Sequence, residues 1–423
     1  MKSQKNIRKS GFFLFNTLNN QLIVSGSNFL STILATRILG LEKFGIFSIA
    51  WSIVLLGNNL LNATFLTPLL NISPKLKTED RRNYINNSFF LLSIFCIITA
   101  FIFFLVFSLF GENLGLINID NKFPLLVSLF IVFSLFYEFS RRVFYALRQI
   151  GQVYKFDILR YGIQISLLLF LYIKGLKDIN LVISCFAISS FAAIILRIKR
   201  IPFNPLKVKN ILGTLSRNFT MAKWLIPSAA FFWFSLNMFT IFCGIFLGPL
   251  SVGVLKIMQT LYSAISIWLQ GLDNWIQVES SKILSTKGFL ALNRFLQKFF
   301  LILLILIFAA VLLVNLNFVF ISELLFDVDL SNYRLGIFIY SLAVIFNSIN
   351  QPFKYFINAI ENTKTTFIAE LIAVFVVALS GYTLIKNYEL IGALIGIAIM
   401  KFSVLFVYLI VYLKKRKENI DRK

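Results

Sequence analysis

The chain has 423 residues, of which 58% are apolar and only 14% are charged. Soluble domains carry about 25% charged residues, so a water-soluble enzyme, a disordered chain and a nucleic-acid-binding domain are excluded as descriptions of the whole chain. The mean hydropathy of +0.82 indicates a polytopic helical membrane protein. The net charge of +23 is then explained mainly by cations between apolar segments, where they set orientation and contact lipid headgroups.

Twelve apolar segments follow one another along the chain. A bilayer core of about 30 Å needs about 20 apolar residues per helix, and each segment is long enough to supply them. We therefore predict an all-α membrane protein with twelve transmembrane helices. The segments cover residues 12–36, 45–70, 85–110, 123–146, 156–173, 180–197, 221–247, 251–275, 297–320, 334–357, 366–386 and 389–413.

A basic stretch that contains two prolines separates six segments from the other six. We expect an N-terminal lobe at 1–200, a cytoplasmic linker at 201–220 and a C-terminal lobe at 221–423. When successive loops are assigned to alternate sides, 31 of the 41 Lys and Arg residues share a side with both termini, and 7 lie on the other. The positive-inside rule therefore predicts that both termini are cytoplasmic.

Two sequence matches indicate that the halves are repeats. Leu39-Gly40 followed by Gly45-Ile46 recurs 208 positions later as Leu247-Gly248 followed by Gly253-Val254. At an offset of 213, Glu138, Arg141, Ala146 and Asp157 match Gln351, Lys354, Ala359 and Glu370. Six helices per half would make the repeats parallel, which is a transporter architecture with the substrate path between the halves.

The segment 251–275 carries a polar stripe along its whole length. At 100° per residue the stripe spans an arc of about 140°, and it contains Lys256, Gln259, Thr260, Ser263, Ser266, Gln270, Asp273, Asn274 and Gln277. Lipid cannot face these groups, because an unsatisfied polar group costs several kcal/mol in hydrocarbon. The stripe either lines a water-filled cavity or joins packed helices, and its length and mixed charges favour the cavity. The segment 45–70 also carries polar residues on one side, among them Asn58 and Asn62.

Lys401 lies near the middle of the segment 389–413. A charge at this depth is costly and usually faces protein or water, so we expect Lys401 to face the cavity. The alternative is a buried ion pair with an acid such as Asp273.

Charged residues also gather where the fourth and fifth segments meet. Arg141 and Arg142 share a face with Glu138, and Arg160 follows Asp157 at a spacing that allows the two to pair. The arginines bind either lipid headgroups or a substrate phosphate, or they serve only to orient the protein. Any proton coupling would have to use carboxylates, for which the candidates are Asp157, Asp273 and Glu370.

Catalytic machinery is missing from the sequence. Histidine is absent, so a histidine triad, zinc site or proton relay is impossible. The three cysteines are Cys96, Cys185 and Cys243, and their spacing indicates neither a metal site nor a disulfide framework. No Gly-rich phosphate loop precedes a Lys-Ser or Lys-Thr pair. We therefore expect a protein that is not an enzyme and that uses no metal and no cofactor.

The sequence combines the twelve segments and the internal repeat with two motifs, Leu39-Gly-Leu-Glu-Lys-Phe-Gly45 and Glu138-Phe-Ser-Arg-Arg-Val-Phe-Tyr-Ala146. In these features it resembles the polysaccharide-exporter branch of the MOP superfamily. That branch includes the Wzx-type O-antigen flippases. The resemblance implies a MATE/MOP-like fold with two six-helix lobes that alternate access around a cationic cavity. It also implies that an undecaprenyl-diphosphate-linked oligosaccharide is moved from the cytoplasmic to the outer leaflet of a bacterial inner membrane, for lipopolysaccharide or other polysaccharide biosynthesis.

The resemblance also implies partners, namely that lipid-linked substrate, membrane lipids, a polysaccharide polymerase and its chain-length machinery. Nucleic acid is not among them. The residues that we expect to bind substrate are Lys256, Lys401, Arg141, Arg142, Arg160, Gln259, Ser263, Ser266, Gln270, Asn58 and Asn62.

Two other functions stay open. A cation-coupled multidrug exporter of the same superfamily would prefer a carboxylate-rich cavity. The polar residues expected to line the path here include more cations than carboxylates. A membrane-embedded glycosyltransferase or polymerase would need catalytic acids or a sizeable outer loop, and this sequence offers neither clearly.

Overall fold

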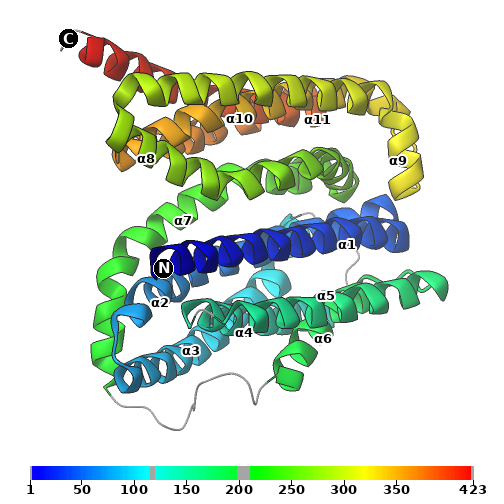
Figure 1. Cartoon of the computed structure of the whole chain (residues 1–423). Helices are drawn as coiled ribbons and strands as arrows, with labels where there is room; N and C mark the ends of the chain where they lie inside the picture. Colours follow the sequence, from blue (N-terminus) through cyan, green and yellow to red (C-terminus); the bar gives the residue numbers. More distant parts are fainter. Residues whose placement is uncertain (1, 115–119, 148, 198–209, 421–423) are drawn as a thin grey trace. The chain divides into compact units, whose positions relative to one another are not determined.

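The structure is a computed structural model that describes residues 2–114, 120–147, 149–197 and 210–420. Side chains are described throughout these ranges except at 2–19, 114, 197, 264–275, 278, 363 and 419–420. All regular structure in this part of the chain is helical, as predicted (Figure 1). By length and composition, nine stretches of it are able to cross a membrane.

The N-terminal helices are α1 (Lys2–Leu61), η1 (Asn62–Leu66), α2 (Thr67–Ile72), η2 (Ser73–Lys75), α3 (Thr78–Phe110), η3 (Glu112–Leu114), α4 (Phe123–Ala146), α5 (Ile150–Ile173) and α6 (Ile179–Arg197). They are followed by α7 (Ile211–Leu247), α8 (Pro249–Leu316), α9 (Phe318–Phe326), η5 (Ser331–Tyr333), α10 (Arg334–Ala359) and α11 (Thr363–Ile420).

Three long helices each contain one residue with non-helical backbone angles. These residues are Gly40 in α1, Gly288 in α8 and Glu389 in α11. Each break separates two helical arms, and the predicted apolar segments lie on either side of it. All twelve predicted segments coincide with helical chain, except that Asn317 interrupts the segment 297–320 and that Glu389, with non-helical angles, is the first residue of the segment 389–413. The number of membrane crossings stays a prediction.

The backbone repeats itself at the positions that the sequence matches indicated. Gly40 has φ 70° and ψ 174°, and Gly248 has φ 83° and ψ 174°. Glycine adopts positive φ readily because it has no Cβ, and each glycine joins the first two helical arms of its half. At the second offset, α4 and α10 end at Ala146 and Ala359, and α5 and α11 begin 213 positions apart. The two halves therefore share one helical plan.

The chain forms two compact units, Met1–Trp233 and Phe234–Lys423, which divide inside α7. The first part of α7 belongs to unit 1 because it is hydrogen-bonded to α3. Tyr84 OH donates to Asn218 Oδ1 at 2.6 Å, and Asn87 Nδ2 donates to Thr214 Oγ1 at 2.8 Å. The expected lobe boundaries stay predictions. Residues 201–209 of the expected linker lie outside the described residues, and 211–220 form the start of α7.

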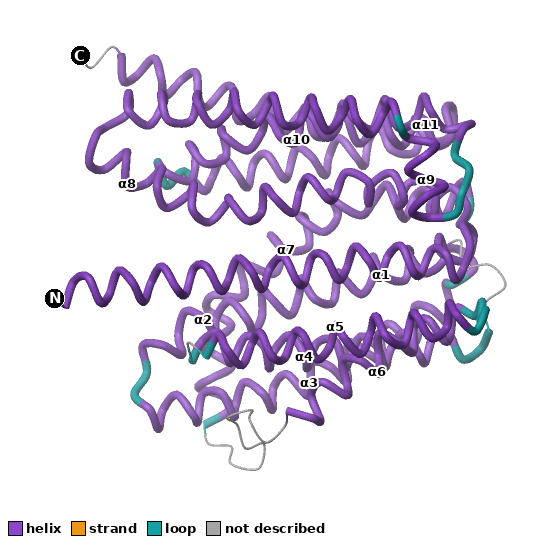
Figure 2. The backbone as a smooth tube through the Cα atoms, turned by 45° about the vertical axis from the view of Figure 1, so that its right-hand side comes forward, coloured by secondary structure: helices purple, strands orange, loops and turns teal. Residues whose placement is uncertain are grey.

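Aromatic side chains fill the interior of each unit. In unit 1, where α4 packs against α3 and α6 (Figure 2), the rings of Trp51, Phe130 and Phe186 contact one another with centroids 5.3–5.7 Å apart. In unit 2, α10 packs against α8 and α11, and Phe356 and Tyr412 pack edge to face at 5.2 Å. Many large apolar side chains point outward, which suits a protein surrounded by lipid.

Candidate functional site

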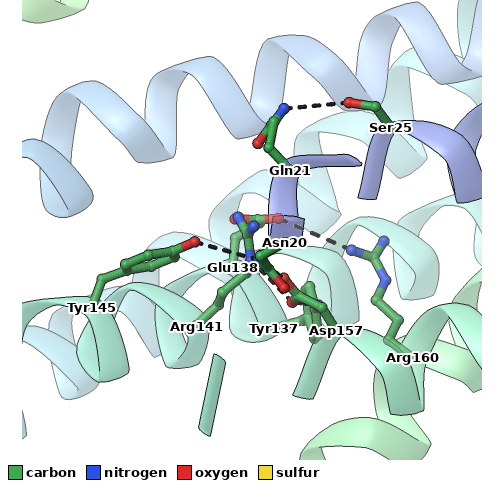
Figure 3. A network of polar contacts seen from close by, with 9 residues as sticks. All are labelled: Asn20, Gln21, Ser25, Tyr137, Glu138, Arg141, Tyr145, Asp157 and Arg160. Carbon is green, nitrogen blue, oxygen red and sulfur yellow. Dashed lines mark hydrogen bonds and ion pairs between the residues drawn. The ribbon is translucent and has the colours of Figure 1, made fainter. Parts of the chain in front are cut away.

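The carboxylate of Asp157, near the start of α5, is the centre of a polar network in unit 1 (Figure 3). This residue is completely buried. Its oxygens accept hydrogen bonds from Arg141 Nε at 2.9 and 3.0 Å, from Asn20 Nδ2 at 2.6 Å and from Tyr137 OH. All three partners are hydrogen-bond donors, and one of them, Arg141, also carries a positive charge. The network joins the first arm of α1 to α4 and α5.

A second carboxylate, Glu138, completes the charge balance of this network. Its oxygens lie 3.6 Å from Arg141 Nη1 and 4.0 Å from Arg160 Nη1. The Arg160 guanidinium also lies over the ring of Tyr137, 4.2 Å from its centroid, which is a cation–π contact. The pairing of Arg160 with Asp157 that the spacing suggested is not observed, because Arg141 already holds Asp157 from the neighbouring helix.

Arg142 differs from the other two arginines. Its Nε is buried without a hydrogen-bond partner, and its guanidinium lies 6.0 Å from the centroid of the Tyr145 ring. Among the described side chains no carboxylate lies within 4.0 Å of it. Substrate binding by Arg141, Arg142 and Arg160 stays a prediction, and Arg142 is the one whose charge is least compensated.

The described polar side chains at the start of the stripe on α8 make hydrogen bonds within their own helix. The hydroxyls of Thr260 and Ser263 donate to backbone carbonyls of their own helix at 2.7 and 2.6 Å. Lys256 Nζ lies 3.5 Å from Gln259 Oε1, and both residues are half-buried. The expected cavity role stays a prediction. The side chains of Ser266, Gln270 and Asp273 lie outside the described residues.

The two asparagines expected on the second segment lie on either side of the end of α1, at Leu61. Asn58 is half-buried, and its Oδ1 has no hydrogen-bond partner. Asn62 is exposed and begins the π-helical turn η1. Such turns occur frequently at functional sites, and the role of both residues in substrate binding stays a prediction.

Labelling of single cysteines tests whether the described part of the stripe faces water. In a variant whose three native cysteines are replaced, we expect Gln259→Cys and Ser263→Cys to react with a membrane-impermeant thiol reagent. Leu261→Cys, which replaces a side chain that is 7% exposed, should react much more slowly. Labelling of all three sites at the same rate would show that the stripe does not define a water-exposed face.

Lys401 lies on the second arm of α11 and is half-buried. The other side of this arm packs tightly, because a Cβ at Gly396 would lie 2.3 Å from Phe239. Glu370 and Lys354 are the charged residues that act electrostatically on Lys401. No described carboxylate lies within 4.0 Å of its ammonium group. The alternative partner suggested by the sequence was Asp273, whose side chain is not described.

Glu370, a candidate coupling residue, lies on the first arm of α11. Its Oε2 accepts a hydrogen bond from Ser235 Oγ at 3.1 Å. This contact matches the one in unit 1, since Asn20 and Ser235 each lie on the first helix of their half and donate to a carboxylate on the fifth. Coupling by Asp157, Asp273 or Glu370 stays a prediction.

Sequence reasoning did not place three residues in the unit 1 network. Asn20 belongs to a polar run on the first segment, which was its only signal. Glu138 was recognised as sharing a face with the arginines but not as their counter-ion. Tyr137 has no signal beyond its position four residues before Arg141, on the same side of α4.

No protein-family model matches the sequence, and no curated protein is detectably similar to it. Solved structures do match the fold over almost the whole chain. An inward-facing multidrug resistance MATE transporter of the MOP superfamily matches with a TM-score of 0.72 and 14% identity, over 95% of this chain and 96% of that one. The lipid II flippase MurJ in an inward closed conformation matches with a TM-score of 0.68 and 14% identity, over 95% and 87%.

A MOP-superfamily transporter from Pyrococcus furiosus matches with a TM-score of 0.63 and 13% identity, over 95% of each chain. The chain therefore has the fold of MOP-superfamily transporters and is a multi-pass membrane protein. Its structural neighbours are transporters and flippases rather than enzymes.

Proposed function

We propose that this chain is a flippase that moves an undecaprenyl-diphosphate-linked oligosaccharide from the cytoplasmic to the outer leaflet of a bacterial inner membrane. It would work by alternating access, with both termini in the cytoplasm. Its product would supply a polymerase and chain-length machinery that build O-antigen or another surface polysaccharide.

The observation that carries the proposal is the unequal pairing of charges within the transmembrane helices. Asp157 and Glu138 each have an arginine within 4.0 Å. Lys256 and Lys401 have no described carboxylate that close. Two phosphates that pass through a low-dielectric region need counter-charge, or the cost of desolvation blocks them. These two lysines, which have no carboxylate within ion-pair distance among the described side chains, supply this charge for an anionic headgroup.

The same observation argues against a multidrug exporter. A cationic drug needs a carboxylate that is free to bind it. The two carboxylates of the unit 1 network already compensate arginines, and in unit 2 Glu370 acts on Lys401 together with a second cation, Lys354. The experiment must still test the multidrug exporter, because the fold of a MATE transporter matches this chain as well as the fold of the flippase MurJ does.

Deletion of the gene in its native bacterium tests the proposal. We expect loss of surface polysaccharide and accumulation of the diphosphate-linked oligosaccharide in the inner leaflet, where it is inaccessible to a lectin added to spheroplasts. A plasmid copy should restore both. Normal surface polysaccharide together with increased sensitivity to cationic dyes would favour the multidrug exporter instead.

A further inference from the structure

The internal repeat allows the two units to be compared residue by residue. Lys354 and Glu370 of unit 2 occupy the positions of Arg141 and Asp157 in unit 1, 213 residues earlier. In unit 1 these side chains form a pair at 2.9 Å. In unit 2 no ion pair within 4.0 Å joins them, although both side chains are described. The ion pair of unit 1 therefore has no equivalent within 4.0 Å in unit 2.

Two other members of the unit 1 network are replaced by smaller residues in unit 2. Asn350 stands where Tyr137 stands in unit 1, and Ala373 stands where Arg160 does. Ala373 has no side-chain donor, and the amide donor of Asn350 is used elsewhere. Asn350 Nδ2 instead donates to the backbone carbonyl of Lys401 at 3.2 Å, which brings α10 against the second arm of α11.

Unit 2 also gains a cation that unit 1 lacks. The position equivalent to Lys401 is Ile188, an apolar residue that is 50% exposed. Lys354 lies one helical turn after Asn350, on the face of α10 that packs against the second arm of α11, and it acts electrostatically on Lys401. Two lysines and one glutamate leave this cluster with a net charge of +1.

Unmet hydrogen-bonding capacity accompanies this charge. The buried side-chain oxygens of Asn350 and Gln351 have no partner in unit 2. The two ends of a glutamine amide are assigned from the hydrogen-bond network, so Gln351 can present its NH₂ group to an acceptor. An anion bound here would find two ammonium groups, and Gln351 would donate to it if its amide turned over.

We propose that Lys354 and Lys401 form a binding site for a phosphate group of the transported substrate, with Glu370 as the internal counter-ion that the phosphate displaces. The proposal rests on the flippase function for the identity of the ligand. Competition by Glu370 keeps the site weak enough to release its ligand, which a transport pathway requires. In the unit 1 cluster Asp157 keeps its arginine, so Arg141 is less available to a phosphate than Lys354 is.

Diphosphate binding to the full-length chain tests this site. The protein is placed in nanodiscs of zwitterionic lipid, and its affinity is measured for inorganic pyrophosphate and for farnesyl diphosphate. We expect Lys354→Gln and Lys401→Gln each to weaken binding about tenfold, through loss of one ammonium–phosphate contact. Glu370→Gln should strengthen binding several-fold, which a merely structural role of Glu370 would not do.

The control is Lys282→Gln, which removes the same charge from a side chain that is 67% exposed on α8 and should leave affinity unchanged. All variants must keep the melting temperature of the parent, and Lys354→Arg should retain binding if Lys354→Gln unfolds. Pyrophosphate and farnesyl diphosphate should respond in the same direction, because the site contacts phosphate and not the prenyl chain. A response limited to the prenyl ligand would overturn the site.

Unchanged affinity in Lys354→Gln, or weaker binding in Glu370→Gln, would also overturn it. These failures are distinct from failure of the flippase function. A deletion strain with normal surface polysaccharide would contradict the flippase, whereas a working flippase whose diphosphate affinity ignores Lys354 would contradict only this site.

Discussion

Replacing Arg141 by alanine should destabilise the protein by about 3–5 kcal/mol, because it strands a buried carboxylate. Arg141 is 8% exposed, Asp157 is completely buried, and no other cation lies within 4.0 Å of Asp157 among the described residues. Tyr137 and Asn20 would still donate to the carboxylate but would not neutralise it. We expect a lower melting temperature of the purified protein and less of it in the membrane.

The matched control is Lys282→Ala, which removes the cation of a pair with Glu279 at 3.8 Å on the surface of α8. Exposed pairs contribute about 0–1 kcal/mol, so this variant should melt close to the parent. Arg141→Met combined with Asp157→Leu should recover part of the loss, because no charge is then stranded. A parent-like melting temperature for Arg141→Ala would show that the network does not hold α4 and α5 together.

Replacing Lys401 by alanine should sharply reduce surface polysaccharide while the protein remains folded and inserted. The flippase function requires counter-charge for the diphosphate, and Lys401 supplies it deep within α11. Lys401→Arg should retain more activity, because the charge persists although the wider guanidinium fits less well. Lys256→Ala should have a smaller effect, because Lys256 lies near the start of α8, closer to the end of its segment than Lys401 is to the ends of its own.

Measurement of both glycan display and membrane abundance separates this role from a structural one. If Lys401 served only to neutralise Glu370, its removal would strand that carboxylate and lower abundance along with display. Normal display at normal abundance in the Lys401→Ala, Lys256→Ala double variant would contradict the cationic pathway. The flippase assignment would then lose the observation that carries it.

Much of the fold could be predicted from local features of the sequence. The repeated Leu-Gly pairs in the sequence indicated that helical arms end at Gly40 and Gly248. Both glycines have positive φ, a backbone conformation that glycine adopts without strain. The helices themselves follow from apolar length, since a chain in lipid must satisfy its backbone hydrogen bonds within each segment. Local chemistry therefore decided the class and the element order.

The pairing of charges could not be predicted in the same way. Asp157 and Arg160 lie three positions apart on one helix, and that spacing favoured a pair. In the structure Asp157 is bound by Arg141 from α4 and by Asn20, which lies 137 positions away in the sequence. Arg160 is within reach of Asp157 along α5, but packing of the helices places Arg141 and Asn20 closer to it. The spacing of residues along one helix does not show which side chains a neighbouring helix supplies.

The two units also differ in a way that only packing decides. Amino-acid composition and hydropathy were enough to establish a helical membrane protein with a basic balance, because burial of apolar length in lipid depends on each segment alone. Whether a given charge is neutralised depends on how several segments pack, so Arg141 and Lys354 looked alike as matched cations in a repeat. Packing made the first a buried ion pair with Asp157, and it left the second without a carboxylate within 4.0 Å among the described side chains.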